Sequence, residues 1–171
     1  MSIGVVGYGR LGASLAARLR AQGHVMDVYC DSETTPTPDA YETVPSPRAL
    51  LDRSTSIILL CPDNAQRVET LLNGREGLLG DDLEGRLIVD CCLHDRETAI
   101  ALHDQVKAAG GRYLEAPVVE EFKATPGAEL SLWVSGDKPD YEDAAEMLSA
   151  LASHHEFVGG PGEATRRLSA P

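Results

Sequence analysis

The chain has 171 residues, of which 43% are hydrophobic and 25% are charged, and its formal net charge is −12. This length allows one well-packed domain. The acidic balance argues against nucleic acid and anionic membrane surfaces as partners, because both require a basic face. The sequence has no apolar run of about eighteen residues and no basic segment typical of a signal peptide, so we expect no membrane association.

The first predicted strand, 3–6, runs into a glycine-rich motif that consists of Gly7, Tyr8, Gly9, Arg10, Leu11 and Gly12. Leu11, Leu15 and Leu19 then recur at helical spacing. Strand, glycine turn and helix in this order form the dinucleotide-binding fingerprint. The alternative is a glycine turn that only joins two core elements.

Each glycine of the motif has a mechanical role in such a site. Gly7 permits the tight turn, Gly9 lets the backbone approach a pyrophosphate, and Gly12 lets the helix pack closely on the strand. The pyrophosphate is then expected on N–H groups at the positive end of the helix.

The second strand, 24–31, ends in an acidic residue. Asp31 stands nineteen residues after Gly12, where a carboxylate can accept hydrogen bonds from a ribose 2′-hydroxyl and repel a 2′-phosphate. The sequence therefore favours NAD over NADP as the cofactor. The alternative is that Asp31 only begins a polar loop.

Strand-like apolar runs alternate with amphipathic stretches along the rest of the chain. An irregular loop rich in Thr and Pro is expected at 32–43, and strands are expected at 57–61, 86–91, 112–116, 130–134 and 155–158. Helix starts are predicted at the caps Ser46-Pro47, Asn64, Asp95 and Asp137. We predict one α/β domain over 1–171, a Rossmann-type doubly wound and mostly parallel sheet with helices on both faces. A truncated helix is expected to start at 163–171.

The four cysteines all fall near the ends of predicted strands. They read as small buried hydrophobic residues of a protein in the reducing cytoplasm. Convergence of Cys61, Cys92 and His94 on a metal is the alternative, but the chain has no C-x-x-C pair, and we expect no metal.

Four later segments extend the pattern: Leu60-Cys61-Pro62-Asp63, Asp90-Cys91-Cys92-Leu93, Glu115-Ala116-Pro117-Val118-Val119-Glu120-Glu121 and Gly159-Gly160-Pro161-Gly162-Glu163-Ala164. With the glycine motif they make the chain, from Ile3 to about Leu168, resemble the N-terminal NAD(P)-binding domain of the β-hydroxyacid dehydrogenases. That family contains 3-hydroxyisobutyrate and 6-phosphogluconate dehydrogenases, and imine reductases share its scaffold. A strand that ends in proline beside the glycine turn favours cofactor contacts from Cys61, Pro62 and Asp63, and the alternative is a plain strand terminator. The resemblance implies substrate contacts from Cys92, Val119, Glu120 and Glu121.

The chain departs from the family at its chemical positions. Cys92 stands where the family has serine, and Val119-Glu120-Glu121 replaces Ser-Gly-Gly. Two glutamates would repel an acid and suit a cationic or amine substrate better. Leu168 stands at the position that the resemblance gives to the catalytic lysine, and it cannot donate a proton. The sequence ends where the family's helical second domain begins, so it is either a domain of a longer enzyme or a free-standing Rossmann module. The expected partners are a helical partner domain or a second copy in a homodimer.

No catalytic residue can be assigned from the sequence. His94 could protonate an alkoxide or an amine, but a solvent-facing loop histidine is the favoured interpretation. Three hypotheses follow. The first is an NAD(P)-dependent oxidoreductase acting on a small hydroxy acid, carbonyl or imine, which is favoured. The second is a stand-alone NAD(P)-binding module without turnover, and the third is a non-redox enzyme on the same scaffold.

Overall fold

The computed structural model describes residues 2–30, 40–119 and 129–169. Its elements are, in chain order, β1 (Ser2–Val6), α1 (Arg10–Ala21), β2 (Val25–Tyr29), β3 (Glu42–Thr43), η1 (Arg48–Leu50), β4 (Ile57–Leu60), α2 (Arg67–Asn73), η2 (Leu78–Gly80), β5 (Leu87–Asp90), α3 (Arg96–Ala108), β6 (Arg112–Glu115), β7 (Ser131–Gly136), α5 (Lys138–Leu151), β8 (His154–Gly159) and α6 (Glu163–Ser169). In these three ranges, no helix combines the length and the apolar character needed to cross a membrane.

The strands form one eight-stranded sheet in the order β3-β2-β1-β4-β5-β6-β7-β8. Every pair is parallel except β6 and β7, which are antiparallel. Because β1 lies between β2 and β4, the strand order reverses beside it, and sheets of this kind bind ligands at the carboxyl ends of the strands around such a point. The predicted Rossmann-type, mostly parallel sheet is confirmed.

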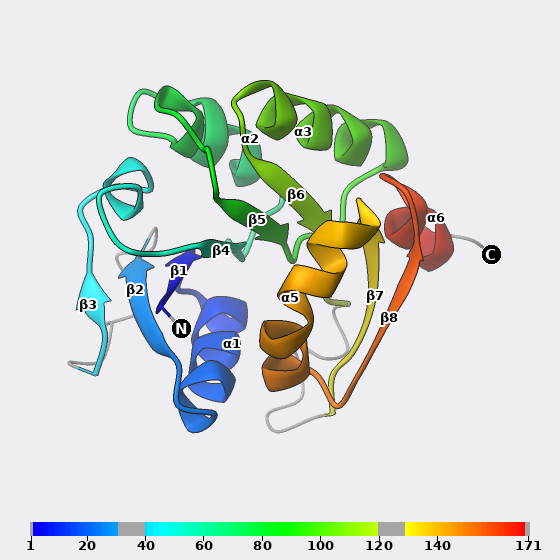
Figure 1. Cartoon of the computed structure of the whole chain (residues 1–171), viewed down its shortest axis with the longest axis horizontal. Helices are drawn as coiled ribbons and strands as arrows, with labels where there is room; N and C mark the ends of the chain where they lie inside the picture. The colour runs from blue at the N-terminus through cyan, green and yellow to red at the C-terminus, as the bar shows by residue number, and fades with distance from the viewer. Residues whose placement is uncertain (1, 31–39, 120–128, 170–171) are drawn as a thin grey trace.

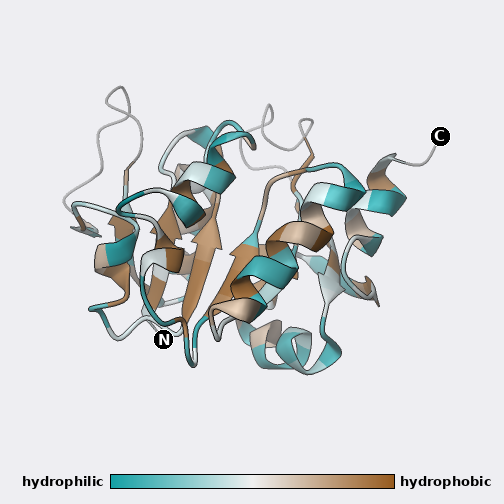
Figure 2. Cartoon of the chain, turned by 90° about the horizontal axis from the view of Figure 1, so that it is seen from above, coloured by the Kyte–Doolittle hydropathy of each residue, from teal (hydrophilic) through white to brown (hydrophobic). Residues whose placement is uncertain are grey.

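Helices cover both faces of the sheet, as predicted. Figure 1 shows α1 and α5 on one face and α2 and α3 on the other. Figure 2 shows the brown, apolar strands enclosed between helices whose outer surfaces are largely hydrophilic. The α1 and α5 face packs on Val5, Leu59 and Val89, and the other face packs on Ile58 and Ile88. The central strands are therefore buried on both sides, which explains their continuous apolar sequences.

Local signals placed most helix starts correctly. Asp95 caps α3 through a 2.8 Å hydrogen bond from the Thr98 N–H, as predicted. The side-chain oxygen of Asn64 instead accepts a hydrogen bond from the N–H of Gln66, in the turn that precedes the helix. α2 begins at Arg67, and its N-cap residue, Gln66, forms no side-chain capping bond. Part of the loop predicted at 32–43 lies outside the described residues, but its last two residues form β3, which pairs with β2.

Candidate functional site

The turn between β1 and α1 leaves no room for side chains. Gly7 has a φ of +96°, which favours glycine, and its N–H donates to the Tyr29 carbonyl at 3.0 Å. A Cβ on Gly7 would lie 2.5 Å from the Pro62 nitrogen, and one on Gly12 would lie 1.9 Å from the Gly7 carbonyl oxygen. The turn is thus packed between α1 and the end of β4, and glycine is required at both positions.

The N-terminus of α1 directly follows the glycine turn. Its N-cap is Gly9, which provides no side-chain hydrogen bond, and its first turn contains no acidic residue. Arg10 is exposed at the first helical position. The first N–H groups of a helix have no intrahelical partners and lie at the positive end of its dipole. This arrangement fits the pyrophosphate of a dinucleotide.

Three residues after β4 form a wall beside the glycine turn. The Cys61 thiol donates to the Gly7 carbonyl at 3.4 Å. Pro62 packs its backbone against Gly7, and the Asp63 carboxylate lies so close to Gly9 that a Cβ there would fall 1.8 Å from Oδ2. Cys61 therefore holds the turn through the Gly7 carbonyl, whereas Asp63 places a negative charge beside the first N–H groups of α1.

Tyr8 takes part in this turn only through its backbone. Its side chain is buried, and its ring lies 5.7 Å from that of Tyr41 in an edge-to-face arrangement. Burial and the neighbouring Tyr41 raise the pKa of Tyr8 to about 12. The phenol is thus protonated and directed into the core.

A buried polar cluster lies at the carboxyl end of β5. The side chain of Asp90 is fully buried, and its Oδ2 accepts hydrogen bonds from the Tyr113 hydroxyl at 2.7 Å and from Nε2 of His94 at 2.8 Å. Its Oδ1 accepts from the Cys92 N–H at 2.8 Å. Three donors therefore compensate the buried carboxylate, which keeps its position fixed.

His94 is not the solvent-facing residue that the sequence analysis favoured, because its side chain is only 6% exposed. Burial alone would lower the pKa of His94, but the hydrogen bond and negative charge of Asp90, together with Glu115, raise that pKa above its ordinary value. Burial and Asp90 also raise the pKa of Tyr113 well above its usual range. Tyr113 therefore stays protonated and acts as a donor, whereas Asp90 favours the protonated form of His94.

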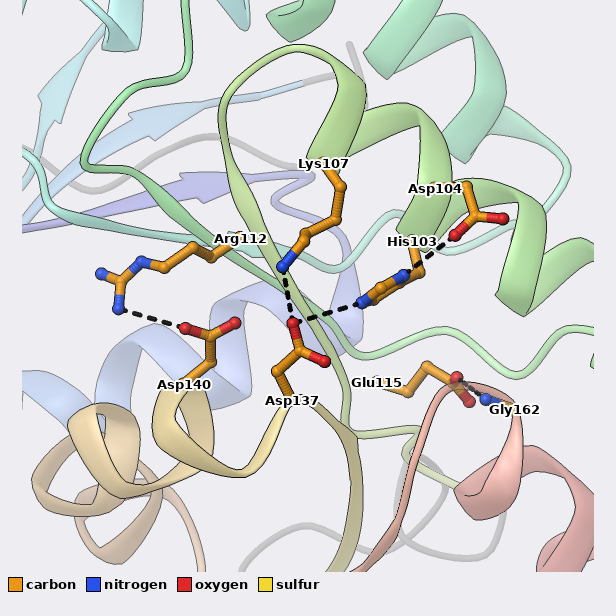
Figure 3. Close-up of polar contacts among 8 residues, drawn as sticks. All are labelled: His103, Asp104, Lys107, Arg112, Glu115, Asp137, Asp140 and Gly162. Atoms are coloured by element: carbon orange, nitrogen blue, oxygen red, sulfur yellow. Dashed lines mark hydrogen bonds and ion pairs between the residues drawn. The ribbon is translucent and has the colours of Figure 1, made fainter.

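Glu115 continues this polar row across the sheet. Asp90 of β5 pairs in register with Glu115 of β6, which pairs with Ser135 of β7. Glu115 accepts a hydrogen bond from the N–H of Gly162, just before α6 (Figure 3). Ser135 accepts from the N–H of Ala164. The two side chains thereby hold the start of α6 against the sheet.

Of the other predicted site residues, Cys92 belongs to the Asp90 cluster, and the rest are dispersed or lie outside the described residues. Cys92 is buried, with its thiol 3.7 Å from the Pro62 carbonyl oxygen, and Val119 is half-buried. Leu168 lies half-buried on α6. Asp31, Glu120 and Glu121 belong to the ranges that the structure does not describe. Across the three described ranges, no group of three or more His, Cys, Asp or Glu residues is arranged to hold a metal ion.

A groove of about 630 Å³ lies between α2 and α3. The end of the groove nearest the sheet is lined by Asn64 and His94, which follow the carboxyl ends of β4 and β5. Because Asn64 directly follows Asp63, the groove adjoins the wall of the glycine turn. This position is near the edge at which ligands of such sheets bind.

Sequence reasoning did not find Asp90 and Tyr113 as site residues. The available signal was an aspartate closing the apolar strand Leu87-Ile88-Val89. A carboxylate at the end of a strand buried on both faces needs donors. Tyr113 lies 23 residues further along the chain, and only the pairing of β5 with β6 brings its hydroxyl to Asp90.

The glycine turn, the open N-terminus of α1 and the mostly parallel sheet together define a Rossmann-type dinucleotide-binding domain. Residues 2–160 match the family described as the NAD binding domain of 6-phosphogluconate dehydrogenase, and the chain belongs to this family.

Relatives with known names agree with this family. The 2-hydroxy-3-oxopropionate reductase of Escherichia coli (strain K12) is 32% identical over 171 residues, which cover 95% of this chain and 56% of the reductase. The human mitochondrial 3-hydroxyisobutyrate dehydrogenase is 25% identical over 169 residues, which cover 96% of this chain and 50% of that enzyme. The chain thus spans about half the length of these curated relatives.

A solved structure supports the fold independently. The imine reductase from Myxococcus stipitatus in complex with NADP+ superposes with a TM-score of 0.86 at 23% identity, covering 99% of this chain and 59% of that chain. At this identity the likeness concerns the fold.

Proposed function

We propose that the chain is the cofactor-binding part of an NAD(P)-dependent oxidoreductase that transfers hydride to or from a small hydroxy acid, carbonyl or imine. The observation that carries the proposal is the glycine turn, in which Gly7 and Gly12 admit no side chain and the N-terminus of α1 carries no capping group. Family membership and the names of the reductase and dehydrogenase relatives support it.

In this proposal the nicotinamide supplies the hydride, and the protein binds and orients the cofactor. The N–H groups at the start of α1 hold the pyrophosphate, with the exposed Arg10 beside them. Pro62 and Asp63 form the wall beyond the turn, and Cys61 keeps the turn in place. A helical partner domain or a second copy of the chain would complete the substrate site.

Calorimetric titration with NADH and NADPH tests the proposal directly. We expect micromolar binding of at least one of them, with a preference for NADH if the Asp31 carboxylate contacts the ribose 2′-hydroxyl. Light scattering on the same sample gives the oligomeric state. A folded chain that binds neither cofactor would overturn the proposal.

The role of Asp31 has its own test. In an Asp31→Arg variant the guanidinium would attract a 2′-phosphate, so the ratio of the NADH and NADPH dissociation constants should shift towards NADPH. Asp52→Arg, an exposed residue before β4, serves as the charge-matched control. An unchanged ratio in the Asp31 variant would remove this residue from the site.

A binding module without turnover is the second candidate. It is favoured by the buried Cys92, whose thiol lies against the Pro62 carbonyl, and by the aliphatic side chains of Val119 and Leu168. Val119 and Leu168 have no side-chain proton to donate to a carbonyl or imine, and the Cys92 thiol is directed to the Pro62 carbonyl oxygen instead. Under this alternative the chain binds NAD(P)H, but no hydride transfer is detected with any hydroxy acid, carbonyl or imine.

Introducing an ammonium group on α6 separates the two candidates further. Leu168→Lys places a lysine where the resemblance expects one, and Arg166→Lys tests the exposed position two residues earlier. A gain of turnover in either variant would indicate an oxidoreductase site that lacks only its acid. Binding of NADH without any such gain would support the binding module.

A further inference from the structure

We propose that the groove between α2 and α3 binds a small organic amine with an apolar body, whose N–H group donates to Nδ1 of His94. The proposal goes beyond cofactor binding and does not depend on hydride transfer. It is based on the size of the groove, on the orientation of one buried histidine and on the chemistry of the lining.

The groove has the dimensions of a ligand site. Its volume of about 630 Å³ lies within the range of roughly 300–1,000 Å³ that is typical of small-molecule pockets. Its apolar lining includes the buried Val68 and Leu102 and, at the mouth, Leu93, which is 41% exposed. Large apolar side chains at a concave surface favour a ligand with an apolar body.

His94 is oriented so that one ring nitrogen remains for a ligand. Its Nε2 is held by Asp90, which also accepts from Tyr113. Since a carboxylate only accepts hydrogen bonds, the proton of neutral His94 resides on Nε2, and Nδ1 carries a lone pair. Within the described part of the chain Nδ1 has no hydrogen-bond partner, although the side chain is only 6% exposed and lines the groove.

The remaining polar groups of the lining favour a donor or a cation over an anion. Two carboxylates, Glu69 and Asp95, line the groove, and none of its described lining residues is lysine or arginine. Asp95 uses both oxygens to bind Thr98, but its charge remains. An anionic ligand would meet two like charges, whereas an ammonium would meet two opposite charges and the acceptor on His94.

Protonation of His94 opposes binding of such a ligand, because it removes the acceptor on Nδ1 and adds a positive charge. The groups that favour this protonation are Asp90 and Asp95 on its own segment and Glu115 on β6. Tyr113 of β6 donates to Asp90, and Glu69 of α2 also lines the groove. Affinity for an amine should therefore rise with pH through the titration of His94, while the amine itself remains an ammonium ion.

The test is a calorimetric titration of the full chain with cyclohexylamine, cyclohexanol and cyclohexanecarboxylate, which share one apolar body. For a ligand of this size we expect a dissociation constant for the amine of about 1 mM or below, and at least tenfold weaker binding of the carboxylate. Affinity for the amine should be lower at about pH 5.5 than at about pH 8.5. Equal binding of amine and carboxylate, or no binding of the amine, would overturn the proposal.

Two variants locate the site. Ala101→Phe fills the groove from an exposed position on α3, so it should abolish amine binding while the melting temperature and NADH binding stay unchanged. His94→Gln should weaken amine binding at least tenfold and remove its pH dependence, whereas His154→Gln, on the exposed start of β8, should change neither. Amine binding that persists in Ala101→Phe would place the site elsewhere. NADH titrations of the same samples report separately on the proposed oxidoreductase function.

Discussion

The carboxylate of Asp63 lies against the backbone of Gly9, beside the open N-terminus of α1. A negative charge at the positive end of a helix stabilises that helix, but it also repels a phosphate that binds to the same donors. Removing this charge should therefore favour NADH binding but destabilise the cofactor-free chain. Asp63→Asn should tighten NADH binding roughly three- to tenfold, and it should lower the stability of the cofactor-free chain by about 0.3–1 kcal/mol.

Calorimetry and urea denaturation measure these two effects separately. Asp52→Asn removes an equivalent charge from an exposed turn before β4 and should alter neither quantity. Weaker NADH binding in Asp63→Asn would instead indicate that the carboxylate itself contacts the cofactor.

Gly12 fixes the distance between α1 and the glycine turn. A methyl group there would lie 1.9 Å from the Gly7 carbonyl oxygen, so the helix must shift to accept it. Gly12→Ala should destabilise the chain by about 1–3 kcal/mol and weaken NADH binding. Gly160→Ala is the matched control, because a Cβ there meets nothing within 4 Å. Equal urea midpoints for the two variants would contradict the packing described for Gly12.

The pair of Asp90 and His94 predicts a pH dependence of stability. The folded state holds the pKa of His94 above its ordinary value, so it binds this proton more tightly than the unfolded chain does. The resulting stabilisation is complete below the ordinary pKa of histidine and is lost as the pH rises through the raised pKa. His94→Gln should therefore cost more stability at about pH 5.5 than at about pH 8.5. A cost that is equal at both pH values, measured by urea denaturation, would exclude this coupling.

Asp137 connects α3 with the start of α5. Figure 3 shows its carboxylate between Lys107 and His103. Nζ of Lys107 lies 2.6 Å and Nε2 of His103 lies 3.9 Å from Oδ2 of Asp137. The hydrogen bond from Lys107 holds the pKa of Asp137 below its usual value, although partial burial opposes this. The ion pair of Asp137 and Lys107 thus contributes to the free energy of unfolding above the ordinary pKa of aspartate, and this contribution is lost as the pH falls through the lowered pKa of Asp137.

Removal of the Lys107 charge should have a small effect. The side chains of Lys107 and Asp137 are 45% and 40% exposed, so solvent screens their attraction. Lys107→Met should cost less than about 1 kcal/mol at neutral pH in urea denaturation. The more exposed Lys138→Met, whose partner Glu142 is 4.0 Å away, should cost still less. A larger loss would show that Asp137 depends on Lys107 to keep its position beside His103.

Local sequence signals were sufficient for the fold because its main elements carry their own period and caps. The spacing of Leu11, Leu15 and Leu19 predicted the buried side of α1, and Asp95 marked the start of α3. The two-residue strand β3 was not found, because its only support is a short pairing with β2. Asn64 was misassigned because an asparagine turn before a helix has the same sequence signature as a cap.

The polar part of the site depends on contacts between distant segments. The glycine turn was predictable because its six residues are consecutive. His94 was misinterpreted because its burial depends on Asp90 and on the position of α3, which a single loop sequence does not reveal. The roles of Tyr113 and Glu115 follow from the register of β5 against β6, which sequence periodicity leaves undetermined.

The position of β1 between β2 and β4 also determines which backbone amides are protected from hydrogen exchange. Val5 and Val6 are fully buried, and the N–H groups of Gly7 and Cys61 extend the hydrogen-bond ladders on either side. Backbone amides at the centre of such a sheet exchange with deuterium only when the whole domain opens, whereas short outer strands exchange through local fraying. We therefore expect the slowest-exchanging amides in β1 and β4, so the turn that receives the dinucleotide is anchored to the last part of the chain to open.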